Sequence, residues 1–340
     1  MPDSLKTRSQ LSSGREAERH RSGTSSWVLL FILSQCILFA FLTTSLFAQD
    51  SAAQPFLGRW DLTLTNGSGK LPSWIDVSED NGQLKLVFVG VTDHATWMKE
   101  AAVKDGQLMW VSPANEEGFP ADTTYSLKRV GGGLKGTVTN SQNQWSVVGE
   151  RAPSFKDQAV TGWGRPIKLF NGKNLSGWRF KDPAKASTWK VVDGDLVKSG
   201  NGSEMMTTRK FRNFKLHVEF NAGPSSNSGV YLRGRYEVQI ETNSASEPPS
   251  HHTGGVYGFL DPTPEQPRVA DKWQSFDITL IGRTVTIVQN GITVIDHKEI
   301  PGITGGALDS NEGQPGPIYL QGSENGRVAF RNLVLTPAKN

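Results

Sequence analysis

The sequence has little cysteine and no large excess of charge of either sign. Cys36 is the only cysteine among the 340 residues, and it lies in an N-terminal apolar run. From residue 49 onward the chain therefore has no disulfide, thiol nucleophile or cysteine metal site. The 36 basic and 33 acidic residues give a net charge of +3. That excess is too small to attract a phosphate backbone, so we expect no nucleic-acid partner.

One long apolar run stands near the N-terminus. Basic residues precede it, and from Trp27 to Ala48 the sequence carries no charge. A basic region, an apolar core and a small residue at Ala48 are typical of a secretory signal. We predict a signal peptide or N-terminal anchor over residues 1–48, and export to the periplasm or extracellular space. Contact with a membrane is expected only if this segment stays uncleaved.

The rest of the chain has no segment of ten or more residues with helical periodicity, and its 36 glycines suit many tight turns. Residues 50–152 alternate apolar and polar residues in short runs. Asn81-Gly82 and Asp105-Gly106 are hairpin signals between such runs. About eight strands are expected, in a small antiparallel barrel or meander that serves as an accessory domain. A linker follows at 151–164.

Residues 165–338 continue the pattern of short strands. In one of them Phe214, Leu216, Val218 and Phe220 alternate with polar residues. Around fourteen such strands predict an all-β fold, a C-terminal jelly-roll β-sandwich preceded by the smaller β-structure.

Several short motifs occur in this half of the chain in a fixed order. They are Leu169–Trp178, Trp189–Gly194, Asn227–Arg233, Tyr236–Ile240, Thr253–Tyr257, Asn290-Gly291, Tyr319–Gln321 and Phe330–Asn332. Over about residues 165–337 the series resembles the 3-keto-disaccharide hydrolase domain family. The resemblance implies a concanavalin-like (laminarinase-like) jelly roll, export, and cleavage of glycosides already oxidised to a ketone at C3.

Strand alternation predicts which side chains share a face. Glu237, Gln239 and Glu241 lie two apart and should line one face, opposite a core face that begins at Tyr236. If neighbouring strands pair, Glu219 and Arg233 would join them on a concave face. A solvated sheet face would have the same pattern, and the resemblance favours a binding site for Glu237, Gln239 and Arg233.

The implied chemistry requires particular groups. A ketone at C3 acidifies the C2 hydrogen, so a base can remove it, the C1 oxygen can leave, and water can then add. This needs a general base and a cation or donors for the enolate. We predict His252 or Glu237 as base, Arg233 or a bound metal ion at the enolate, and Glu219 as acid or ligand. The predicted substrate-binding side chains are Gln239, Tyr257, Trp273, Gln321 and Glu241.

No dinucleotide fingerprint occurs, so the sequence requires no cofactor, and a separate oxidoreductase would supply the 3-keto-glycoside. A divalent metal ion could still bind a carboxylate-rich face with a nearby histidine. Two other functions fit the same scaffold. One is an ordinary glycoside hydrolase using Glu219 and Glu237 as paired carboxylates. The other is a non-catalytic carbohydrate-binding module.

Overall fold

The computed structural model describes residues 51–67, 69–155, 159–323 and 326–339. The segment predicted as a signal peptide or anchor, 1–48, lies outside the described residues. Within the described ranges, no helix is both long enough and apolar enough to cross a membrane. Residues Ser51–Asn340 form one compact unit, so a division into domains 50–152 and 165–338 stays a prediction.

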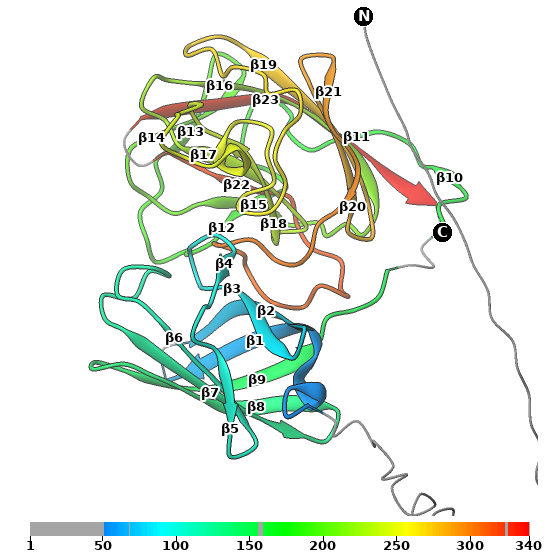
Figure 1. The fold of residues 1–340 in the computed structure, drawn as a ribbon. Helices are drawn as coiled ribbons and strands as arrows, with labels where there is room; N and C mark the ends of the chain where they lie inside the picture. The colour runs from blue at the N-terminus through cyan, green and yellow to red at the C-terminus, as the bar shows by residue number, and fades with distance from the viewer. Residues whose placement is uncertain (1–50, 68, 156–158, 324–325, 340) are drawn as a thin grey trace, which may run out of the picture. The chain divides into compact units, whose positions relative to one another are not determined.

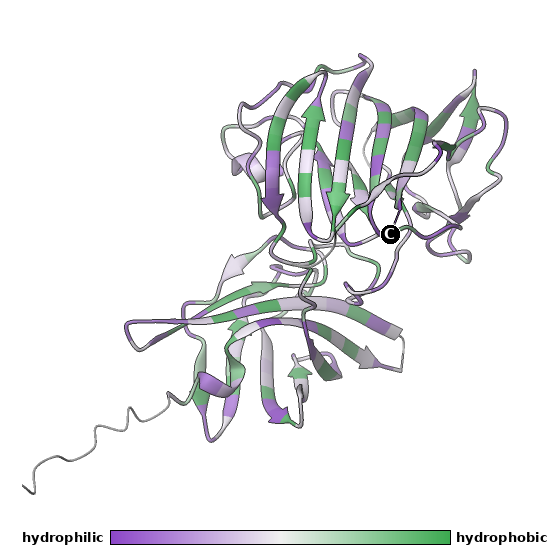
Figure 2. Cartoon of the chain, turned by 90° about the vertical axis from the view of Figure 1, so that its right-hand side faces the viewer, coloured by the Kyte–Doolittle hydropathy of each residue, from purple (hydrophilic) through white to green (hydrophobic). Residues whose placement is uncertain are grey.

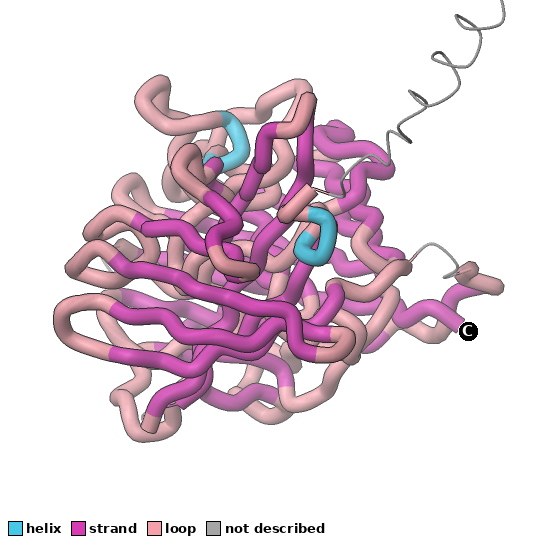
Figure 3. The backbone as a smooth tube through the Cα atoms, turned by 60° about the horizontal axis from the view of Figure 1, so that its bottom comes forward, coloured by secondary structure: helices cyan, strands magenta, loops and turns pink. Residues whose placement is uncertain are grey.

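The structure is almost entirely β, as predicted, and Figure 3 shows strands throughout with two short helices. Both helices are single 3-10 turns, η1 (Gln54–Phe56) and η2 (Pro249–His251). All strand pairs are antiparallel. Figure 1 shows the strands gathered in an N-terminal and a C-terminal set.

The N-terminal set is a single nine-stranded sheet in the order β4-β3-β2-β1-β9-β8-β7-β6-β5. Consecutive strands pair, and β1 pairs with β9, so the sheet is an up-and-down barrel left open between β4 and β5. Its strands are β1 (Gly58–Asn66), β2 (Gly69–Asp80), β3 (Gln83–Val89), β4 (Thr96–Trp97), β5 (Ala102–Lys104), β6 (Gln107–Ser112), β7 (Thr123–Val130), β8 (Gly133–Thr139) and β9 (Gln144–Arg151).

The C-terminal set consists of two sheets packed face to face. The larger has nine strands, with β13-β14-β23-β16-β19-β20-β21 in order and β10 and β11 also paired to β23. Its strands are β10 (Gly162–Trp163), β11 (Ile167–Lys168), β13 (Trp189–Val192), β14 (Asp195–Ser199), β16 (Phe214–Ala222), β19 (Gln274–Ile281), β20 (Thr284–Gln289), β21 (Ile292–Glu299) and β23 (Arg327–Lys339).

The smaller sheet has five strands in the order β12-β15-β22-β17-β18. They are β12 (Trp178–Phe180), β15 (Met205–Thr207), β22 (Tyr319–Gln321), β17 (Ser228–Leu232) and β18 (Tyr236–Ile240). This two-layer antiparallel arrangement confirms the predicted jelly-roll sandwich.

Alternation of apolar and polar residues decides which face of each strand is buried (Figure 2). Along β16, Phe214 and Phe220 are buried in the core between the two sheets, whereas Lys215 is exposed. From the smaller sheet, Val230 and Val238 pack into the same core. Their strand neighbours therefore face away from the core, and this places the candidate site.

The segment predicted as a linker packs and pairs with residues of the C-terminal sheets. Phe155 lies under the guanidinium groups of Arg233 and Arg283, with carbon-to-ring distances of 5.1 and 5.4 Å. Farther along, Trp163 in β10 pairs through its backbone with Ala338 in β23. The connection is thus attached to the C-terminal sheets.

Candidate functional site

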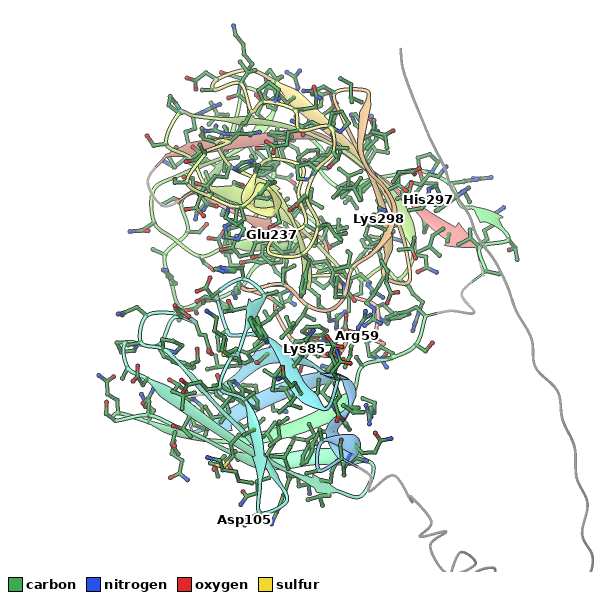
Figure 4. The ribbon with its side chains drawn as sticks, viewed as in Figure 1. Arg59, Lys85, Asp105, Glu237, His297 and Lys298 are labelled. Carbon is green, nitrogen blue, oxygen red and sulfur yellow. The ribbon has the colours of Figure 1, made fainter. Side chains whose placement is uncertain are left out.

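A cavity of about 500 Å³ opens on the face of the smaller sheet that points away from the core. We call it the Glu237 cavity. Of the residues predicted from the sequence, Glu237, Gln239, Tyr257 and Gln321 line it. Figure 4 shows Glu237 within the C-terminal set of strands, whereas Asp105 marks the tip of the β5–β6 hairpin.

Strand register brings these side chains together. Tyr319 of β22 pairs with Tyr231 of β17, which pairs with Glu237 of β18. Two residues away along each strand, Gln321 and Gln239 both pair with Gly229. Since residues two apart share a face, these two rows form the floor of the cavity.

Gly229 leaves the space that the Glu237 carboxylate occupies. A Cβ added at Gly229 would lie 2.1 Å from Glu237 Oε1, far inside van der Waals contact. The carboxylate therefore lies across β17, over the one residue in the row without a side chain. The Asn227–Arg233 motif thus includes a glycine with a steric role in the site.

The Glu237 carboxylate is buried and only partly hydrogen-bonded. Tyr231 Oη lies 2.8 Å from Glu237 Oε2 and 2.9 Å from the carbonyl oxygen of Gly305, so its single proton serves two acceptors. Burial raises the pKa of Glu237 to about 8, and the Tyr231 hydroxyl opposes this rise. The group is therefore mostly protonated at neutral pH and ionises just above it.

Three oxygens in the cavity have no hydrogen-bond partner in the described part of the chain. They are Oε1 of Glu237, Gln239 and Gln321, and each is buried. Buried polar atoms are normally paired, and such unpaired oxygens mark a place where a ligand can donate hydrogen bonds. A sugar carries several hydroxyl donors, which suit this row of acceptors.

Sequence reasoning missed four charged residues that line the cavity: Lys181, Asp182, Lys185 and Glu204. Glu204 accepts hydrogen bonds from Lys198 Nζ, at 3.2 Å, and from the backbone N–H of Gly322. Burial raises the pKa of Glu204 above its ordinary value. Lys181 is exposed at the rim, with Nζ 5.4 Å from the centre of the Tyr319 ring. Glu204 directly precedes β15 in a loop rich in glycine and serine. The alternation of apolar and polar residues applies to strands, so it could not predict the position of Glu204.

His252, predicted as a possible base, does not line the cavity. Its Nδ1 lies 2.9 Å from Glu265 Oε2, and its Nε2 lies 2.9 Å from the carbonyl oxygen of Ser244. Both ring nitrogens are thus engaged elsewhere. The neighbouring His251 points the other way and stacks on Tyr257, with ring centres 4.5 Å apart.

Arg233 also lies outside the cavity, and the expectation that it shares a face with Glu237 is wrong. Its φ of +55° places it in the turn after β17, where strand alternation ends. Its side chain is fully buried and donates to Tyr236 Oη, at 2.8 Å, and to the carbonyl oxygen of Gly282, at 3.0 Å. The positive charge for the enolate was predicted to come from Arg233 or a bound metal ion, and this position excludes Arg233.

Glu219 belongs to the larger sheet and Trp273 directly precedes β19 of that sheet, and neither residue lines the cavity. Glu219 lies on the face of β16 opposite the core, where it binds Arg331 Nε at 2.7 Å and Asn332 Nδ2 at 2.6 Å. Trp273 lies under the Arg331 guanidinium, 3.9 Å from its carbon. Because β16 and β18 are in different sheets, Glu219 cannot gather with Glu237 as predicted.

Glu241 lies beyond the end of β18 and is half-buried beside the cavity. Gln239 Nε2 lies 3.4 Å from its Oε2, and burial raises its pKa. Nowhere in the described ranges do three or more His, Cys, Asp or Glu side chains form a group that could hold a metal ion. The divalent ion stays a prediction.

A second cavity of about 500 Å³ is lined by Arg59, Arg151, Arg283 and Glu299. Its one carboxylate is shared between two of the arginines, because Glu299 Oε1 lies 2.6 Å from Arg59 and 3.2 Å from Arg283. None of the residues predicted from the sequence lines it. The Glu237 cavity is therefore the candidate site.

The C-terminal sheets define a jelly-roll β-sandwich domain, and the family comparison identifies its kind. The chain belongs to the family of the 3-keto-alpha-glucoside-1,2-lyase-like domain, whose model matches residues 165–336. The predicted resemblance is thereby confirmed.

Individual relatives are distant. A 3-keto-disaccharide hydrolase of Bacteroides thetaiotaomicron is 20% identical over 167 residues, which cover 38% of this chain. The chain spans 58% of the length of that relative. Among solved structures, a candidate glycosyl hydrolase of Parabacteroides distasonis is 27% identical with a TM-score of 0.43, covering 55% of this chain and 92% of that one. The carbohydrate-binding module CBM66 of Bacillus subtilis is 13% identical with a TM-score of 0.32, covering 47% and 95%.

Proposed function

We propose that the Glu237 cavity cleaves 3-keto-glycosides by elimination followed by hydration. The observation that carries the proposal is the buried carboxylate of Glu237, whose Oε1 has no partner in the described residues and lies beside two unpaired amide oxygens. The Bacteroides relative named as a 3-keto-disaccharide hydrolase supports the substrate class.

In the first step Glu237, in its ionised form, removes the hydrogen on C2 of the sugar. The C2–H electron pair forms an enolate with the C3 ketone, and the enolate then expels the glycosidic oxygen from C1. Water adds at C1 and a proton returns to C2, so the net reaction is hydrolysis. A base whose pKa is about 8 is suited to this work near neutral pH.

Other cavity residues take the remaining roles in the proposal. Lys181 supplies the positive charge for the enolate, in place of the Arg233 or metal ion predicted from the sequence. Glu204, whose pKa is raised by burial, donates a proton to the leaving oxygen. Gln239 and Gln321 accept hydrogen bonds from sugar hydroxyls, and Tyr257 flanks the ring.

The ketone must be made by a separate oxidoreductase, because the proposed reaction neither oxidises nor reduces the sugar overall. Export of the protein would bring it to sugars outside the cytoplasm. Both statements remain predictions from the sequence.

The test uses paired glucosides with the same aglycone, one oxidised at C3 and one not, with and without a chelator. Release of aglycone from the oxidised member alone supports elimination, and a slower rate with deuterium at C2 shows that the C2–H bond breaks in the rate-limiting step. Inhibition by the chelator would add a metal ion to the mechanism. No release from the oxidised glucoside would overturn the proposal.

A second candidate is an ordinary two-carboxylate glycosidase, now with Glu204 in place of Glu219. It is favoured by one observation, that Glu204 and Glu237 line the same cavity. Equal release of aglycone from both members of the pair, with no isotope effect at C2, would establish this alternative.

A further inference from the structure

The loop between β3 and β4 in the N-terminal sheet reaches the Glu237 cavity. Thr92 in this loop is exposed and lines the cavity together with Gly306 and Tyr257 of the C-terminal set. The backbone N–H of Gly306 donates to the carbonyl oxygen of Val91, at 2.9 Å. A segment outside the family's own region, residues 165–336, therefore contributes to the site.

We propose that this loop, Val91–Ala95, is a specificity element of the Glu237 cavity. It acts as a wall that limits the size of the saccharide and positions the groups around Glu237. The inference rests on the proposed function, since it assigns the N-terminal sheet a part in choosing that substrate.

Close packing holds the loop in place. A Cβ added at Gly305 would lie 2.2 Å from the carbonyl oxygen of Asp93 and 2.7 Å from the carbonyl carbon of Thr92. At Gly302 an added Cβ would lie 2.2 Å from the Trp74 ring, and Trp74 itself is buried with the core of the C-terminal sheets. Such contacts with backbone and with a buried ring leave little room for movement.

A short chain of hydrogen bonds leads from the loop to Glu237. Val91 binds Gly306, and the adjoining carbonyl of Gly305 accepts from Tyr231 Oη at 2.9 Å. The same hydroxyl lies 2.8 Å from Glu237. When Glu237 is ionised, the one proton of Tyr231 serves both acceptors, so the position of the Gly305 carbonyl controls how strongly Tyr231 binds Glu237.

A ring contact forms the second connection. His94 packs edge-on against His251, with ring centres 4.9 Å apart, and His251 stacks on Tyr257 at 4.5 Å. His94 is held by Asp93, whose Oδ1 lies 2.6 Å from His94 Nδ1. The loop thus supports Tyr257, which lines the cavity, through the ring of His251.

The inference is tested in the full chain with two kinds of variant. Thr92→Trp adds bulk at an exposed position facing the cavity, where it disturbs no core. Gly305→Ala pushes the loop and the Gly305 carbonyl apart. The matched controls are Ser141→Trp, at an exposed turn, and Gly132→Ala, where an added Cβ meets nothing within 4 Å.

Two quantities are measured for each variant: kcat/KM, and affinity by calorimetry in a Glu237→Gln background. The probes are methyl 3-keto-glucoside and a 3-keto-disaccharide. Thr92→Trp is expected to lower kcat/KM and affinity for the disaccharide about tenfold or more, with a smaller change for the methyl glycoside. Gly305→Ala is expected to lower kcat for both sugars. The controls should match the parent protein.

The outcomes separate the inference from the proposed function. Suppose that the parent binds the sugars without turnover, and that Thr92→Trp weakens binding of the disaccharide more than binding of the methyl glycoside. The proposed chemistry then fails, and the role of the loop as a specificity element is supported. If turnover occurs and Thr92→Trp changes neither kcat/KM nor affinity for the disaccharide, the inference fails alone. If the parent neither binds nor cleaves either sugar, both are overturned.

Discussion

Glu237 Oε1 occupies the place that a side chain at Gly229 would need. The two residues belong to adjacent strands, β18 and β17, and an added Cβ would lie 2.1 Å from this oxygen and 2.7 Å from Glu237 Cγ. Strand β17 is paired with a strand on both sides, and the outer side of β18 is hydrogen-bonded to residues 254–257, so the two backbones cannot move apart easily. The orientation of the carboxylate therefore depends on a residue that has no side chain.

This relationship predicts the effect of Gly229→Ala. The added methyl group must displace the carboxylate, and a displacement of about 1 Å in a reacting group lowers activity by about 10²-fold. The measurement is kcat/KM on a 3-keto-glucoside, with circular dichroism to verify the fold. Gly132→Ala is the matched control, because nothing lies within 4 Å of the added carbon there. Activity equal to the parent's would mean that the carboxylate position is not important for the reaction.

Glu237→Gln tests the proposed base directly. Glutamine keeps the size and the ability to accept from Tyr231, but it cannot take a proton from C2. We expect kcat to fall by about 10²–10⁴-fold, as when a general base is removed, while affinity for the 3-keto-sugar is retained. Glu100→Gln, at an exposed position, should behave as the parent. If turnover survives in Glu237→Gln, another residue is the base.

The sequence predicted the fold more completely than the site, for a physical reason. Alternation reports which side of a strand is buried, and it correctly separated Glu237 and Gln239 from the core residues Val238 and Tyr236. The hairpin signal Asn81-Gly82 likewise joins β2 to β3, with φ of +52° and +75°. These features depend on near neighbours in the sequence.

The site residues that were placed wrongly depend on features that the alternation of apolar and polar residues does not report. Arg233 falls where the strand turns, so the two-residue period no longer applies. Glu219 follows the period correctly, but only the pairing of strands shows that β16 and β18 lie in different sheets. Glu204 and Thr92 enter the site from loops, whose course depends on long-range packing rather than on local pattern.

The pH dependence of the reaction follows from the pKa of Glu237. A base must be ionised to act, so kcat/KM should rise about tenfold per pH unit below pH 8 and level off above it. Tyr231→Phe removes the hydrogen bond that lowers this pKa, and the midpoint should move to higher pH. Tyr319→Phe is the control, because Tyr319 makes no hydrogen bond to Glu237. A rate that falls through pH 8 would make Glu237 the acid.

A separate prediction concerns stability and the buried Glu117 of the N-terminal sheet. Tyr125 Oη donates to Glu117 Oε2 at 2.7 Å, yet burial raises the pKa of Glu117 to about 9 from 4.5. The folded protein therefore holds this proton more tightly than the unfolded chain. The contribution to stability is complete below pH 4.5 and is lost as the pH rises toward 9.

Glu117→Gln removes this loss, because glutamine does not ionise and can still accept from Tyr125. We expect the variant to exceed the parent in free energy of unfolding by about 1–3 kcal/mol at pH 9, and to differ little at pH 5. Denaturant titration at both pH values measures the difference. Glu116→Gln, exposed and adjacent, should leave the parent's pH dependence intact. The prediction is wrong if the free energy of unfolding falls equally for Glu117→Gln and the parent between pH 5 and pH 9. Glu117 would then ionise without cost in the folded protein, which means that water reaches its carboxylate.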